Sequence, residues 1–129
     1  MKSVLLIIDD REEIGRVIKR SLRKNFDDIL FAKCAAEAVL LLDANLITHV
    51  VCDLFLGKDE PLGHELMREW RNRKPSIKYV ALFTGSNTET MPVHDGIDAV
   101  FQKPDGLMDL IGILKSHETK EVSVLGQQI

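Results

Sequence analysis

The sequence predicts an α/β protein in which a doubly wound, five-stranded parallel sheet carries helices on both faces. Five short apolar stretches alternate with segments of helical periodicity along the 129 residues, and neither a repeat nor an internal linker interrupts them. This alternation favours a parallel sheet, and right-handed crossovers then place helices on both sides of it. The length suits one domain with a substantial core. We expect that domain to span 1–117 and a tail or linker to span 118–129.

The expected strands are short and rich in aliphatic and β-branched residues. They span 4–8, 29–32, 49–52, 79–83 and 98–102. In the third strand, apolar residues continue without interruption into Asp53. Such a run is typical of a central parallel strand that is buried on both faces.

Apolar spacing predicts helices over 12–25, 35–44, 62–74 and 105–116. Their expected core residues are Ile14, Val17, Ile18, Leu22 and Phe26, then Leu66, Met67 and Trp70, then Leu107, Leu110, Ile111 and Leu114. A further helix begins at Ser86, where 86–89 has the form of a capping box. Because Pro92 follows so soon, we expect this fourth helix to be short or irregular.

Two helical surfaces permit more than one interpretation. Leu40, Leu41 and Leu42 make the second helix apolar on more than one face. Packing between the sheet and a neighbouring helix is the favoured explanation, and contact with a partner is the alternative. The basic residues of the helix over 62–74 are interpreted as a solvated face; they are Arg68, Arg71, Arg73 and Lys74.

Composition excludes several classes of protein. A net charge of -3 gives no sign of a nucleic-acid-binding or membrane-surface protein. The apolar run before Asp9 is too short for a signal peptide, and no run reaches the roughly 20 residues of a transmembrane helix. Cys34 and Cys52 lack metal-ligand spacing, so we expect two free thiols and a cytoplasmic protein.

Polar residues follow four of the five expected strands. Asp9 and Asp10 follow the first strand, Asp53 the third, Thr84 the fourth and Lys103 the fifth. The carboxyl ends of parallel strands share one edge of the sheet, which is where open α/β sheets bind ligands. We therefore expect three carboxylates, a hydroxyl and an ammonium to meet there.

This combination of groups suits phosphoryl chemistry. Three ionised carboxylates repel one another, and a hard divalent cation such as Mg²⁺ relieves that repulsion. Lys103 supplies a second positive charge and Thr84 a hydroxyl donor. Asp53 could then attack phosphorus and form an aspartyl phosphate. Each residue alone has a simpler explanation: Asp10 could cap the first helix with Glu13, and the others could lie in ordinary turns.

Together, these motifs resemble the receiver domains of two-component response regulators over about 2–117. The matching segments are Ile8-Asp9-Asp10, Cys52-Asp53-Leu54, Thr84-Gly85-Ser86, Lys103-Pro104 and Gly63-His64-Glu65-Leu66. The resemblance implies a flavodoxin-like strand order 2-1-3-4-5 and a cis Lys103–Pro104 bond.

The same resemblance implies roles for the site residues. Asp53 would accept phosphate from a histidine kinase or phosphotransfer protein. Asp9 and Asp10 would bind Mg²⁺ together with Asp53 and the backbone carbonyl of Phe55. Thr84 and Lys103 would contact the phosphoryl group.

The chain also departs from the family pattern. Gly57 stands where the family usually has proline, and the loop over 56–62 is longer than usual. Val100 stands where the family often has an aromatic switch residue, with Phe101 beside it, and the segment from Thr84 to Lys103 is shortened. The phosphorylation chemistry is thus expected to be intact and the signal readout to be non-standard.

The leading hypothesis is a phosphorylation-driven switch that controls a downstream protein or output domain. The alternative is an interaction module with the receiver fold that acts independently of phosphate. We expect no turnover enzyme: a phosphohydrolase is disfavoured because Phe55 occupies the place of its second acid, and dinucleotide binding because no glycine-rich turn follows the first strand. Direct binding to nucleic acid or membrane is not expected, whereas a homodimer is compatible with the sequence.

Overall fold

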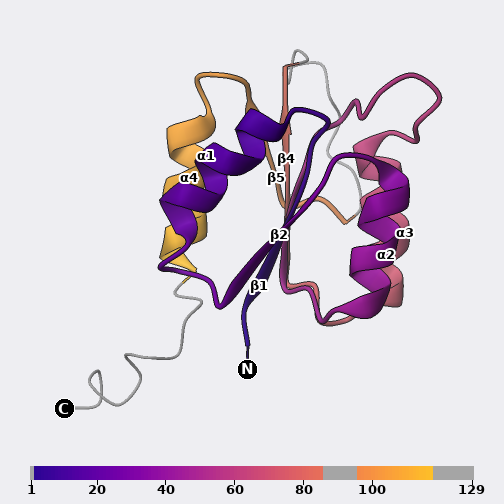
Figure 1. Ribbon diagram of the computed structural model, residues 1–129, viewed down its shortest axis with the longest axis horizontal. Helices are drawn as coiled ribbons and strands as arrows, with labels where there is room; N and C mark the ends of the chain where they lie inside the picture. The colour runs from indigo at the N-terminus through magenta and orange to yellow at the C-terminus, as the bar shows by residue number, and fades with distance from the viewer. Residues whose placement is uncertain (1, 86–95, 118–129) are drawn as a thin grey trace.

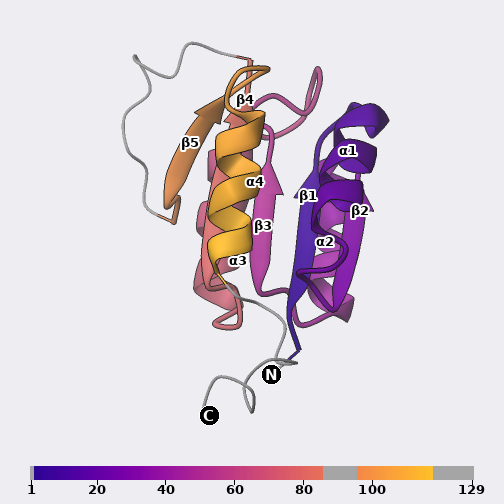
Figure 2. The ribbon, with the colours of Figure 1, turned by 90° about the vertical axis from the view of Figure 1, so that its left-hand side faces the viewer.

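A computed structural model describes residues 2–85 and 96–117 of the chain. Its centre is a parallel sheet with the strand order β2-β1-β3-β4-β5, as Figure 2 shows. The strands are β1 (Val4–Ile8), β2 (Asp28–Ala32), β3 (His49–Cys52), β4 (Tyr79–Thr84) and β5 (Ala99–Gln102). This confirms the fold class and the strand order that the family resemblance implied.

The four described helices form two outer layers. They are α1 (Glu12–Leu22), α2 (Ala35–Ala44), α3 (Gly63–Arg73) and α4 (Leu107–Ser116). Helices α1 and α4 cover one face of the sheet, and α2 and α3 cover the other (Figure 1). No helix within the described ranges is long and apolar enough to cross a membrane.

The core is divided by the sheet into two clusters, and the alternation of strand side chains supplies both. In β1, Leu6 and Ile8 face the α2–α3 layer, while Leu5 and Ile7 face the α1–α4 layer. Because both faces are covered, every residue of this strand is buried. The expected core residues of α3 and α4 pack as predicted.

Several predicted boundaries move by one to three residues. Helix α1 ends at Leu22 rather than 25, yet Phe26 still reaches the core from the turn that follows. Helix α4 begins at Leu107 because residues 103–106 form turns, in which the Gly106 N–H donates to the carbonyl of Gln102. The predicted core position of Val17 is wrong, since its side chain is 41% exposed.

The predicted fourth helix after Ser86 and the tail over 118–129 lie outside the described residues. The basic face of α3 is only partly solvated. Arg71 donates to the backbone oxygens of Gly96 and Lys78 and pairs with Asp98 at 2.6 Å, so it joins α3 to the chain that enters β4 and β5.

Candidate functional site

The carboxyl ends of β1 and β3 position two buried carboxylates side by side. Asp53 directly follows β3, and its N–H donates to the carbonyl of Ile8 at 2.8 Å. Asp9 follows β1 and donates in the same way to Ala32 of β2. Both aspartates are buried, so these ladder hydrogen bonds hold two charged groups at a rim with little access to water.

Lys103 reaches both carboxylates from the end of β5. Its Nζ lies 2.8 Å from Oδ2 of Asp9 and 3.1 Å from Oδ2 of Asp53. The N–H of Lys103 donates to the carbonyl of Thr84, which fixes the base of the side chain beside β4. The Lys103–Pro104 bond is cis, as the resemblance implied. Lys103 therefore pairs with residues that lie 94 and 50 positions away in the chain.

Burial and charge act against each other in this cluster. Burial raises the pKa of the Asp9 carboxyl above its ordinary value, although hydrogen bonds from Lys103 and from the N–H of Arg11 partly offset the effect. Burial alone would lower the pKa of Lys103, but the hydrogen bonds and charges of Asp9 and Asp53 outweigh it and raise that pKa. The ammonium is therefore held firmly in its charged form.

A third carboxylate lies close to this pair. One oxygen each from Asp9, Asp10 and Asp53 can lie within 4.8 Å of one another, so these residues could hold a metal ion. Asp10 is exposed while the other two are buried, which opens the group to solvent on one side. Oxygen-only ligands at the mouth of a rim suit a hard cation that keeps part of its water shell.

The alternative explanation of Asp10 as a helix cap is wrong. The N-cap of α1 is Arg11, and no side chain caps that helix. Glu13 instead pairs with Nε of Arg11 at 2.9 Å. Asp9 does form a local turn, since its Oδ1 accepts the N–H of Arg11 at 2.9 Å. That turn leaves Asp10 exposed beside the buried pair.

The other two predicted residues border the same edge. Thr84 is buried at the end of β4, the strand that lies between β3 and β5. Phe55 follows Asp53 by two residues and forms an antiparallel bridge with Leu62, while its side chain is 56% exposed. The structure thus brings all the predicted site residues to one edge.

The loop after Asp53 is fastened at three points that the sequence did not reveal. Leu56 is buried in the core, and the N–H of Gly63 donates to the carbonyl of Leu54. Glu60 Oε1 accepts the first N–H of α2, from Ala35, at 2.7 Å. Long-range polar contacts of this kind leave no periodic pattern in the sequence, so the role of Glu60 becomes visible only in the tertiary structure.

Gly63 is a second residue whose role depends on the fold. A side chain there would collide with the backbone oxygen of Asp53 and with Sγ of Cys52. The start of α3 can therefore lie against the end of β3 only because this position has no Cβ. The similarity of Gly63-His64-Glu65-Leu66 to the family pattern was the one available signal.

The fold is that of known receiver domains. The structure superposes with a TM-score of 0.76 on a CheY-like response regulator receiver domain from Methanospirillum hungatei, at 21% identity over 92% of this chain and 94% of that one. A response regulator from Thermotoga maritima gives 0.75 at 21% identity, with 93% and 100% covered.

A third similar structure shows the acceptor chemistry in its own chain. It is a response regulator protein from Burkholderia pseudomallei with a phosphorylated aspartic acid, a calcium ion and citrate. The TM-score is 0.74 at 24% identity, over 98% of this chain and 72% of that one. No protein-family model and no curated protein matches the sequence. These likenesses establish the receiver fold.

Proposed function

We propose that the chain is a phospho-accepting receiver domain of a two-component response regulator. Asp53 takes a phosphoryl group from a histidine kinase or a phosphotransfer protein. The observation that carries this proposal is the ammonium of Lys103 between the buried carboxylates of Asp9 and Asp53, with Asp10 beside them. The receiver fold, shared with proteins of this class, supports the same reaction.

In the proposed reaction, an oxygen of Asp53 attacks the phosphorus of a donor phosphohistidine. The nitrogen–phosphorus bond breaks, and its electron pair stays on the imidazole ring. Lys103 changes little in position, because its Nζ already lies 3.1 Å from Asp53, and it neutralises charge on the transferred group. Thr84, at the end of the next strand, donates its hydroxyl to a phosphoryl oxygen.

Mg²⁺ fits the oxygen ligands of this edge. Asp9, Asp10, Asp53 and the backbone carbonyl of Phe55 would hold it, and it would offset the negative charge of the phosphoryl oxygens. Asp9 is well suited to such a cation because burial disfavours its charge unless a positive group lies beside it.

The proposed outcome is a switch and not a turnover reaction. The phosphoryl group adds anionic oxygens beside Thr84 and Lys103, which favours a second arrangement of the edge and so alters binding to a downstream protein or output domain. We place the protein in the cytoplasm, and its two free thiols are compatible with the reducing environment there.

Phosphorylation by a small acyl phosphate tests the assignment directly. With Mg²⁺ present, intact-mass measurement should show one added phosphate, and Asp53→Asn should abolish it. Asp43→Asn, at an exposed position of α2, is the matched control and should retain it. Undiminished labelling of Asp53→Asn would refute the assignment of the acceptor.

One observation supports the alternative of a phosphate-independent interaction module. Val100 is not aromatic and is half-buried against the α2–α3 core. Phe101 is aromatic but is half-buried on the opposite face, so neither position of β5 offers an exposed aromatic side chain. Beryllofluoride with Mg²⁺ separates the two functions. NMR shifts that remain confined to the residues around Asp53 would favour the module, whereas shifts that extend to the helices would favour the switch.

A further inference from the structure

Helix α2 has a largely apolar outer face. Its exposed residues are Ala36, Val39, Leu40, Asp43 and Ala44. Leu40 is 70% exposed, and Leu46, just beyond the helix, is 67% exposed. The exposed faces of α1 and α3 are instead mostly charged. Leu41 and Leu42 do pack inward, so the favoured sequence interpretation holds for them and fails for Leu40.

The apolar face is shaped for a helix. Ala36, Leu40 and Ala44 are spaced by four residues and form a single ridge about 12 Å long, with a large side chain between two small ones. Ridges of this spacing pack into the groove of a second helix at a crossing angle near −50°. The two alanines let the backbone of that helix approach closely on either side of Leu40.

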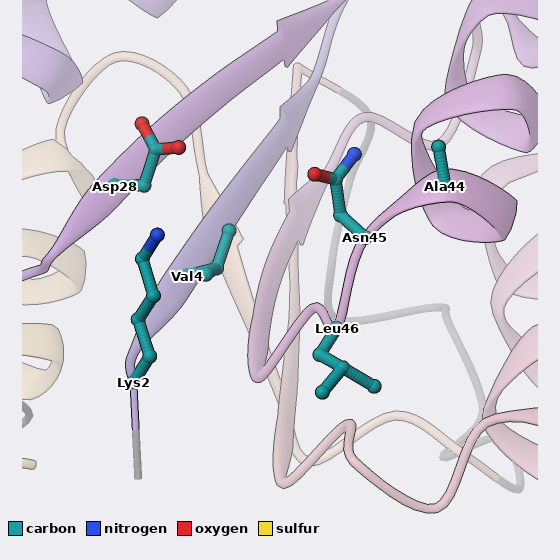
Figure 3. A pocket seen from close by; sticks show the side chains of 6 residues that line it. All are labelled: Lys2, Val4, Asp28, Ala44, Asn45 and Leu46. Atoms are coloured by element: carbon teal, nitrogen blue, oxygen red, sulfur yellow. The ribbon is translucent and has the colours of Figure 1, made fainter.

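The ridge leads into a hollow at the carboxyl end of α2, shown in Figure 3. The hollow has a volume of about 270 Å³ and is lined by Lys2, Val4, Asp28, Ala44, Asn45 and Leu46. Ala44 belongs to both the ridge and the hollow, so the two form one continuous surface. A side chain of a bound helix could enter the hollow as an anchor.

Hydrogen-bond acceptors predominate around this surface. Asp43 is exposed, and no ion pair joins it to another residue in 2–85 or 96–117. Asn45 donates through Nδ2 to the carbonyl of Leu41, which leaves its Oδ1 as an acceptor. Asp28 adds a second carboxylate, against the single ammonium of Lys2. A partner that supplies positive charge and N–H donors would complement these groups.

We propose that the ridge on α2 and the hollow beyond it bind an amphipathic helix of a partner protein, with an apolar stripe and flanking basic residues. A second copy of this chain fits less well. In an antiparallel pair centred on Leu40, Asp43 would lie opposite Glu37 of the other copy, and in a parallel pair opposite Asp43 itself. The ten-residue helix, about 15 Å long, also offers less area than a stable dimer requires, which suits a transient partner.

Two designed peptides test the proposal on the intact chain. Both form a helix with the same leucine stripe, and the flanking residues are lysine in one and glutamate in the other. Binding is followed by ¹⁵N-resolved NMR titration, which gives the affinity and the residues that respond. We expect the lysine peptide to shift signals of α2, Leu46 and Lys2, and to bind at least about tenfold more tightly than the glutamate peptide.

Variants then locate the contact. Leu40→Asn should weaken binding of the lysine peptide about tenfold, whereas Met108→Asn, at an equally exposed apolar position on α4, should leave it unchanged. Asp43→Asn should weaken it severalfold and reduce its salt dependence. Uptake of beryllofluoride should be normal in all three variants, which separates this surface from the proposed acceptor site and shows that each variant is folded.

Three results would overturn the proposal. One is equal binding of the two peptides, which would exclude recognition by charge. Another is signal shifts on α1 or α4 in place of α2. The third is concentration-dependent self-association that Leu40→Asn abolishes, since that would make a second copy the occupant.

Discussion

Acidification is expected to destabilise the protein through a single buried ring, that of His49. This residue begins β3 and is 3% exposed. Its Nδ1 lies 2.8 Å from Oγ1 of Thr48, and the rings of Phe26 and His117 pack edge-on at centroid distances of 5.1 and 5.2 Å. Burial, followed by the charges of His117 and Lys78, lowers the pKa of His49 from 6.5 to about 4.

The sign and size of the effect follow from this shift. Because the folded state resists protonation, the stabilisation is complete above pH 6.5 and is lost as the pH falls from 6.5 towards 4. Between about pH 7.5 and about pH 5 the unfolded chain binds most of a proton that the folded chain does not. The linkage relation then gives a loss of about 2 kcal/mol in the free energy of unfolding from this group.

Urea unfolding, followed by the fluorescence of the buried Trp70, measures this loss, and His49→Phe provides the reference. Phenylalanine preserves the ring packing but cannot titrate, so other titrating groups cancel in the difference between the two proteins. As the pH falls over that range, we expect the free energy of unfolding of the wild type to drop by about 2 kcal/mol relative to that of His49→Phe. A difference that stays constant would refute the argument, as would an NMR titration of the wild-type ring that gives a pKa near 6.5.

Three further predictions, each with a control substitution, test other parts of the structure. Gly63→Ala should strongly destabilise the fold and weaken Mg²⁺ binding, because the added Cβ would collide with the backbone at the end of β3. Gly112 lies in α4 with open space around it, so Gly112→Ala should instead stabilise the protein by about 0.5–1 kcal/mol in thermal denaturation. Arg71→Ala should cost about 1–3 kcal/mol in urea unfolding because the carbonyls of Gly96 and Lys78 and the carboxylate of Asp98 each lose a donor. Arg73→Ala, at an exposed pair with Glu69, should cost under about 1 kcal/mol, and an equal cost for both would contradict the role given to Arg71. Glu60→Ala should cost about 1 kcal/mol and raise amide hydrogen exchange in the first turn of α2, whereas Glu60→Gln should retain most of that protection; unchanged exchange in both variants would exclude the hydrogen bond.

The strands and the edge of the candidate site were predictable because both depend on local pattern. A short run of apolar, mostly β-branched residues such as 50–52 favours a strand buried on both faces, and the polar residue that ends it is then expected at the rim. Periodicity failed where the chain leaves a helix. Phe26 keeps the spacing of α1 although it lies in the following turn, and Val17 shares that spacing yet faces solvent.

Polar contacts between distant segments could not be predicted. Arg71 and Glu60 look like surface charges in the sequence, but each satisfies backbone groups more than twenty positions away. Asp10 and Glu13 illustrate the opposite error, in which a local pattern suggests a contact that does not form. Their spacing fits a capping box, but the structure has a turn at Asp9 in its place. Local rules describe which partners a residue can take, and the tertiary fold decides which partner is near.

The hydrogen bond between Glu60 and α2 has a consequence for how a signal could leave the site. Only seven positions along the chain separate Asp53 from Glu60, and the residues between them include the Phe55 carbonyl, which would move towards a cation. If a cation at the rim displaces that carbonyl, the short segment that ends at Glu60 offers a route to the first turn of α2. Any coupling produced in this way would be reciprocal, so cation binding and the order of that turn would influence each other to the same extent.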